Sequence, residues 1–331
     1  MDNSPHTVSI HILDDNSLLN VFYLYRPFFL GEDQDDEARV IGGAQWVGER
    51  WWYKFTHVCR RWRNVILGSA SYLGLSLVCT RGTPVADMLA DSPPLPLVID
   101  YLDEYRGVTA QDEEGTTLAL KQRGRVRRVR LDMPAMNLQT FIMVIDEEYP
   151  ILEYLVIWNR IKDTTGTILV LPEKLQAPRL RHLALVGFAL PIGSRLLSTA
   201  VGLVTLCLVM NHPSTYVPPN TLLLWLSSMP RLETLVITFL SFLLNIDAEG
   251  QLAHTPAMTP VALPNLHFFT FRGGGTWRHS FIGSQLAPRS LKSTSSTIPF
   301  FPFHVSCSLW ARWITPDSTV PNWSSPIGEF V

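Results

Sequence analysis

Residues 180–185, Leu-Arg-His-Leu-Ala-Leu, place apolar side chains at the first, fourth and sixth positions of a six-residue unit. The same spacing recurs in five other segments, which are Val126–Leu131, Leu152–Ile157, Leu203–Leu208, Leu232–Ile237 and Leu266–Phe271. Successive units start 26, 28, 23, 29 and 34 residues apart, by subtraction of the numbers 126, 152, 180, 203, 232 and 266. Each unit predicts a short strand whose apolar side chains point inward; strand alternation places the fourth and sixth positions on one face and the third and fifth on the other.

The interval between these units is that of a repeat protein. A short strand with this apolar spacing, repeated roughly every 20–29 residues, is the signature of leucine-rich repeats. Since one unit cannot bury its own apolar face, neighbouring units must stack into a curved solenoid with a shared core. The sequence therefore predicts an α/β leucine-rich-repeat solenoid over residues 76–275, with a long concave surface that recognises another macromolecule.

The residues between the apolar positions are expected to line that concave surface. The first strands offer arginine and aromatic side chains, which are enriched at binding hot spots, and the later strands offer small or β-branched ones. We predict that a protein partner binds a set of five side chains at the first strands, which are Arg128, Arg130, Tyr154, Trp158 and His182. The alternative interpretation, that these are ordinary solvated strand residues, stays open.

Further elements are expected between and before the repeat strands. Thr83–Asp91 is predicted to be a short helix, and Leu95–Tyr101 a strand. Residues 112–123 are predicted to form a helix with acidic residues first and basic residues last, as the helix dipole favours. Helices are also expected at 137–148 and 221–229.

Two helical runs are expected near the N-terminus. The first run has candidate N-caps at residues 14–17 and ends at Pro27, with Leu18, Val21, Phe22 and Tyr25 on one face. The second run ends at Gly68 and carries Phe55, Val58, Trp62 and Val65 on one stripe. The acidic stretch Glu32–Glu37 between the runs is expected to be a solvated loop.

The segments Ile12–Phe22 and Val58–Arg63 resemble the F-box motif, in which a leucine-proline start and an apolar helix precede a valine-cysteine-basic-basic-tryptophan segment. Over about residues 8–273 the chain is similar to the large F-box-like families of mushroom-forming fungi. Two features depart from the family pattern. Leu13 stands where the family has proline, and an insertion at about residues 27–50 separates the two helices.

This resemblance implies that residues 8–75 form an F-box-like helical module that docks onto the Skp-type adaptor of a cullin-RING ubiquitin ligase. Carried over by position, the adaptor-binding residues are Ile12, Leu13, Leu18, Leu19, Phe22, Val58 and Trp62. The solenoid would then select the protein that is ubiquitinated. Three alternatives remain, namely a helical cap for the first repeat, a repeat scaffold or ligand-binding protein unconnected to ubiquitin, and a degenerate family copy.

Composition narrows the classes of function. The 331 residues are 47% hydrophobic and 17% charged, and a formal net charge of -2 gives no general attraction to nucleic acid or anionic membranes. The basic cluster within residues 121–130 lacks interleaved aromatic residues for base stacking, so we do not expect nucleic-acid binding. The most apolar run, residues 196–210, is shorter than a membrane span, so no membrane partner is expected.

The chain also lacks the motifs of common catalytic and metal sites. Gly-x-Ser-x-Gly, His-Glu-x-x-His, Walker and dinucleotide fingerprints are absent, so we expect no enzymatic activity and no cofactor. The scattered cysteines Cys59, Cys79, Cys207 and Cys307 argue against a metal site or a disulfide framework. A reducing compartment, cytoplasmic or nuclear, is therefore expected. Residues 276–331 lie outside the repeat spacing and are expected to be an irregular tail.

Overall fold

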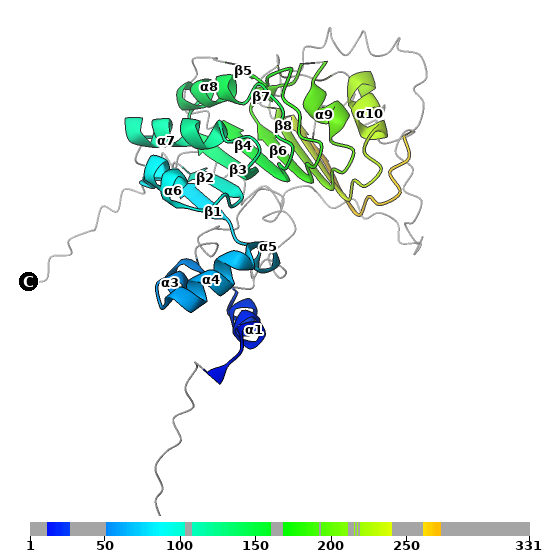
Figure 1. Cartoon of the computed structure of the whole chain (residues 1–331). Helices are drawn as coiled ribbons and strands as arrows, with labels where there is room; N and C mark the ends of the chain where they lie inside the picture. The colour runs from blue at the N-terminus through cyan, green and yellow to red at the C-terminus, as the bar shows by residue number, and fades with distance from the viewer. Residues whose placement is uncertain are drawn as a thin grey trace, which may run out of the picture. The chain divides into compact units, whose positions relative to one another are not determined.

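The structure is a computed structural model of the chain. It describes residues 12–26, 51–102, 108–159, 168–191, 193–210, 215, 217, 219–239 and 261–272. The predicted acidic insertion at about 27–50 and the predicted tail at 276–331 lie outside the described residues. The described part is an α/β protein in which short N-terminal helices precede a parallel sheet (Figure 1).

Eight strands of the described ranges form one sheet in which every neighbouring pair is parallel. They are β1 Leu77–Thr80, β2 Leu97–Leu102, β3 Val126–Met133, β4 Tyr154–Asn159, β6 His182–Val186, β8 Thr205–Met210, β9 Thr234–Phe239 and β10 Phe268–Arg272. The strands lie side by side in the order in which the chain forms them. A strand is present at each of the six predicted units.

The register of the sheet brings equivalent positions of the units together. The fourth positions form one continuous row, which runs through Val129, Leu155, Leu183, Leu206, Leu235 and Phe269. Leu155, Leu183, Leu206 and Leu235 are each at most 2% exposed, so the predicted inward direction of these side chains is confirmed. The apolar spacing therefore encodes one buried face of the sheet.

Helices that connect the strands cover this buried face on one side of the sheet (Figure 1). They are α6 Val85–Asp91, α7 Ala110–Leu120, α8 Ala135–Val144, α9 Arg195–Thr199 and α10 Pro219–Ser227. Their inward side chains, such as Leu120, Phe141 and Leu226, belong to the same core as the strand leucines. A second, two-stranded sheet pairs β5 Leu169–Val170 with β7 Phe188–Ala189.

Four predicted helices are present with shifted boundaries, whereas α9 was not predicted. The predicted helix at 112–123 begins earlier, at Ala110, because Thr109 is its N-cap and Asp112 completes a capping box. Its first turn holds Asp112 and Glu113, as expected. The predicted basic C-terminus is wrong, since the helix ends at Leu120 before Arg123.

The N-terminal helices form a small module, which comprises residues 12–26 and 51–76 of the described chain. Its helices are α1 Asp15–Tyr25, α3 Tyr53–Thr56, α4 Arg60–Gly68 and α5 Ala70–Leu73. The prediction of one continuous helix through Phe55 and Trp62 is wrong. Cys59 is extended, with φ of −159° and ψ of 168°, and its Sγ accepts a hydrogen bond from the Trp62 N–H at 3.5 Å. This cap starts a separate helix, which ends at Gly68 as predicted.

Candidate interaction surfaces

The face of the sheet opposite the leucine rows carries two further rows of aligned side chains. The third-position row, named from the repeat unit, consists of Arg128, Tyr154, His182, Thr205, Thr234 and Phe268. The fifth-position row consists of Arg130, Val156, Ala184, Cys207, Val236 and Thr270. Strand alternation therefore places four of the five predicted partner-binding residues in these two rows, and Trp158 lies two residues beyond Val156 on β4.

Arg130 is held in an ion pair within the fifth-position row. Its Nε and Nη2 donate to Oδ1 and Oδ2 of Asp100, each at 2.7 Å, from the adjoining strand β2. The residue is 3% exposed, so its guanidinium is not offered to a partner as an exposed group. The pair satisfies both charges where desolvation would otherwise be costly.

The rest of the fifth-position row is apolar and buried through Val156, Ala184, Cys207 and Val236. Burial raises the pKa of the Cys207 thiol to about 12, so this cysteine is neutral and unreactive at physiological pH. This part of the face is therefore uncharged.

The third-position row is the accessible part of this face. Arg128 and Tyr154 are half-buried, His182 is exposed, and the Tyr154 and His182 rings lie 5.8 Å apart between centroids. Burial raises the pKa of the Tyr154 hydroxyl, which therefore remains a neutral hydrogen-bonding group. Trp158 is half-buried and lies opposite Asp132 and Val186 in the register. The structure thus gathers an arginine, a tyrosine and a histidine on adjoining strands.

The basic cluster within residues 121–130 is largely paired inside the protein. Arg123 forms a bidentate ion pair with Glu147, and Arg127 Nε donates to Glu153 Oε2 at 2.8 Å. Arg125 donates instead to the backbone carbonyls of Leu95 and Pro93. Carboxylates and backbone carbonyls of the protein therefore occupy the guanidinium groups of Arg123, Arg125 and Arg127. These three arginines do not form an open phosphate-binding patch.

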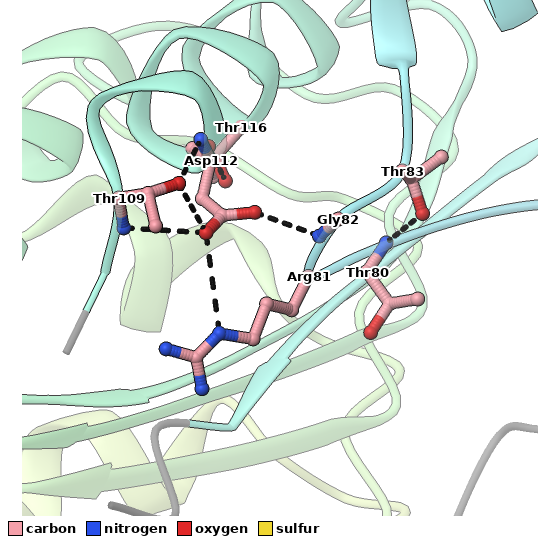
Figure 2. A network of polar contacts seen from close by, with 7 residues as sticks. All are labelled: Thr80, Arg81, Gly82, Thr83, Thr109, Asp112 and Thr116. Atoms are coloured by element: carbon pink, nitrogen blue, oxygen red, sulfur yellow. Dashed lines mark hydrogen bonds and ion pairs between the residues drawn. The ribbon is translucent and has the colours of Figure 1, made fainter. Parts of the chain in front are cut away.

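A polar network joins the turn after β1 to the start of α7 (Figure 2). Asp112 Oδ1 accepts from the Gly82 N–H at 2.8 Å, and Oδ2 accepts from the Thr109 hydroxyl at 2.6 Å. Burial by itself raises the pKa of Asp112, but these hydrogen bonds and the nearby Arg81 outweigh burial and lower it. Gly82 has φ of 69°, which side chains rarely adopt. The network therefore holds a turn and a helix together.

The structure separates the predicted adaptor-binding residues into buried and exposed groups. Leu18 and Phe22 are at most 1% exposed, and the Phe22 ring contacts Phe55 and Trp62 at centroid distances of 5.6 and 5.0 Å. These two residues hold the module together. Leu13, Leu19 and Trp62 are half-buried, whereas Ile12 is 76% and Val58 is 58% exposed.

The module has other exposed apolar side chains, which the F-box-like motif did not identify. Leu24 is 71% exposed, and Val21, Tyr25 and Tyr53 are also exposed. Val21 and Tyr25 lie on α1, the predicted helix, but only Leu18 and Phe22 of this helix are buried. Leu18 and Phe22 are separated by one helical turn, so their side chains are neighbours on α1.

Comparisons of the chain with protein-family profiles, with curated proteins and with solved structures found no match. Among the helices that the structure describes, none is long and apolar enough to cross a membrane. A search of the described residues for three or more neighbouring His, Cys, Asp or Glu side chains that could hold a metal ion found none.

Proposed function

We propose that the chain is the substrate-recognition subunit of a Skp–cullin–F-box ubiquitin ligase. The helical module holds the Skp-type adaptor, and the parallel sheet with its helices acts as a leucine-rich-repeat solenoid that binds a protein substrate. The chain itself performs no chemistry. It raises the local concentration of the substrate beside the transferring machinery.

The observation that carries this proposal is the concentration of exposed apolar side chains on the helical module. Soluble proteins seldom leave clusters of large apolar groups uncovered unless a partner binds them. Ile12 and Val58 come from the two sequence segments that resemble the F-box motif, and both are exposed. Leu24 of α1 and Tyr53 of α3 are exposed as well.

The sheet supports the second half of the proposal. Strands that follow one another in space and in sequence, with their leucines in continuous rows, are the arrangement expected of stacked repeats. The third-position row supplies the arginine and tyrosine side chains that are enriched at protein interfaces. Arg128, Tyr154 and His182 are the residues that we propose contact the substrate.

Capture of a purified Skp-type adaptor by the full-length chain tests the ligase role. Because Ile12 and Val58 are exposed, Ile12→Glu with Val58→Glu should remove apolar contacts without unfolding the module, and should weaken capture about tenfold or more. The matched control is Met136→Glu with Met143→Glu, which changes two exposed apolar residues of α8 and should leave capture unchanged.

Failure of the wild-type chain to capture the adaptor, or equal capture by both double variants, would refute the ligase role. In that case the chain is better described as a repeat scaffold or ligand-binding protein. Capture of a substrate can be tested separately with Arg128→Ala and His182→Ala, since neither residue lies in the helical module.

A further inference from the structure

The face of the sheet opposite the helices is more deeply buried than its own strands can explain. A seventh-position row runs beside the fifth-position row on this face, and it consists of Asp132, Trp158, Val186, Val209 and Thr238. Cys207 of the fifth-position row and Val209 of the seventh are each 1% exposed, and Ala184 is 4% exposed. Side chains on a bare face keep part of their surface in water, whereas parallel sheets are covered on both faces. These exposures therefore require a second layer over the two rows.

The described helices do not supply that layer. They pack against the leucine rows on the other side of the sheet (Figure 1). The core that joins these helices and the helical module to the leucine rows contains none of four buried residues of the opposite face, which are Val156, Ala184, Cys207 and Val209. The cover must therefore come from residues outside the described ranges.

The handedness of the sheet excludes the connections between its strands as the cover. A connection between parallel strands of one sheet is right-handed in about 98% of cases. Each strand of this sheet follows its predecessor in the same direction and in the same spatial order, so connections of that hand lie on a single face. The described helices identify it as the face with the leucine rows. The stretches 160–167 and 240–260, which join successive strands, are therefore not candidates.

Charge and apolar content decide among the segments that remain. Residues 27–50 hold two basic and six acidic side chains, a formal charge of −4, and burial of uncompensated charge against an apolar face is costly. Residues 1–11 carry three large apolar side chains, none of them aromatic. Residues 276–289, after β10, hold no acidic side chain and four large apolar ones, which are Trp277, Phe281, Ile282 and Leu286. The last segment has the composition that these rows require.

Residues 276–289 can also reach both rows. The chain divides into two compact units, and Arg289 is the last residue of the unit that contains the sheet. Neighbouring strands lie about 4.8 Å apart, so the four steps from β10 to β4 cover about 19 Å, which about six extended residues span. The glycines at 273–275, directly after β10, can adopt the backbone conformations of a tight reversal.

We propose that residues 276–289 fold back over the sheet and bury their apolar side chains against the fifth- and seventh-position rows. This inference does not depend on the ligase role. The contact leaves the third-position row accessible. A substrate therefore meets Arg128, Tyr154 and His182 along one margin of the face rather than across its whole width.

Alkylation of the full-length chain at pH 8, followed over time by mass spectrometry, tests the cover at Cys207. Trp277→Asp with Phe281→Asp places two charges in the proposed segment and should raise the rate of Cys207 alkylation about tenfold or more, because charges do not bury against apolar rows. The matched control is Trp310→Asp with Trp313→Asp. It makes the same chemical change outside the segment and should leave Cys207 protected.

A second cysteine and a photo-crosslink complete the test. Cys79 is 0% exposed and lies in the core on the helix side, so it should stay protected in both double variants if the sheet stays folded. Photo-crosslinking identifies the occupant without introducing a charge. With p-benzoylphenylalanine in place of Phe281, crosslinks should fall on β6 and β8, whereas the same probe in place of Trp313 should not reach these strands.

Two results would overturn the proposal. One is a Cys207 that stays protected after the change at Trp277 and Phe281, or that reacts equally in both double variants while Cys79 is protected. The other is a Phe281 probe that crosslinks to the helices, to residues 27–50 or to nothing in the sheet. Where Cys79 also reacts, the variant has unfolded and the crosslink decides. Neither measurement involves the adaptor, so the ligase role is tested separately.

Discussion

The ion pair between Asp100 and Arg130 should contribute strongly to stability, because the two side chains are only 11% and 4% exposed. Removal of one partner from a buried pair leaves an uncompensated charge and costs about 3–5 kcal/mol. We therefore expect Asp100→Leu to lower the free energy of unfolding by that amount. The double variant Asp100→Leu with Arg130→Met should recover most of the loss, since apolar replacement of both partners is nearly neutral.

Urea unfolding monitored by circular dichroism measures these differences, and the double-mutant cycle isolates the coupling between the two residues. The ion pair between Asp15 and Arg61 is a suitable comparison, because its side chains are 66% and 37% exposed. Asp15→Ala should cost at most about 1 kcal/mol. A cost of Asp100→Leu that is no larger than that of Asp15→Ala would refute the reasoning, as would a double variant as unstable as the single one.

Three further predictions concern the core, the cap and the thiols. Leu206→Ala should cost about 2–5 kcal/mol in urea unfolding, because it opens a cavity in the leucine row, whereas Thr205→Ala should change stability by less than about 0.5 kcal/mol. The pKa of the Asp112 carboxyl is lowered from 3.8 in the folded state. Its contribution to stability should therefore be present above pH 3.8 and should be lost as the pH falls through the folded-state pKa. Asp112→Asn should remove this pH dependence from the free energy of unfolding. Alkylation mapped by mass spectrometry at pH 8 should modify Cys59 but spare Cys207 until the protein unfolds, and equal modification of the two in the native state would contradict the assignment of Cys207 to the buried row.

The strands and the inward direction of their fourth and sixth positions were predictable from the sequence, because strand alternation places these two apolar positions on the same face. The buried state of Leu155 and Leu206 follows from local spacing alone. Helix boundaries were less predictable, since they depend on capping contacts. Nothing in the apolar pattern shows that Cys59 interrupts the second helix or that Thr109 starts α7.

The partners of the candidate site residues depend on contacts between distant segments. Arg130 was predicted to be an exposed partner-binding residue, and its burial arises from Asp100, which lies thirty positions earlier and one strand away. Alignment of Ile99 with Val129 would have placed these two residues opposite each other. The signal was present in the chain, but it required the register of β2, a strand outside the repeat spacing.

The sequential order of the strands has a consequence for how the protein acquires its fold. Each strand finds its neighbour within the next few dozen residues, so no pairing waits for the two ends of the chain to meet. Low sequence separation between paired segments speeds folding, and formation can begin at any adjacent pair and spread. Intervals as different as 23 and 34 residues are tolerated, because a longer connection changes only the loop between two neighbouring strands. Evolution can therefore lengthen one connection between strands while the register of the other strand pairs stays the same.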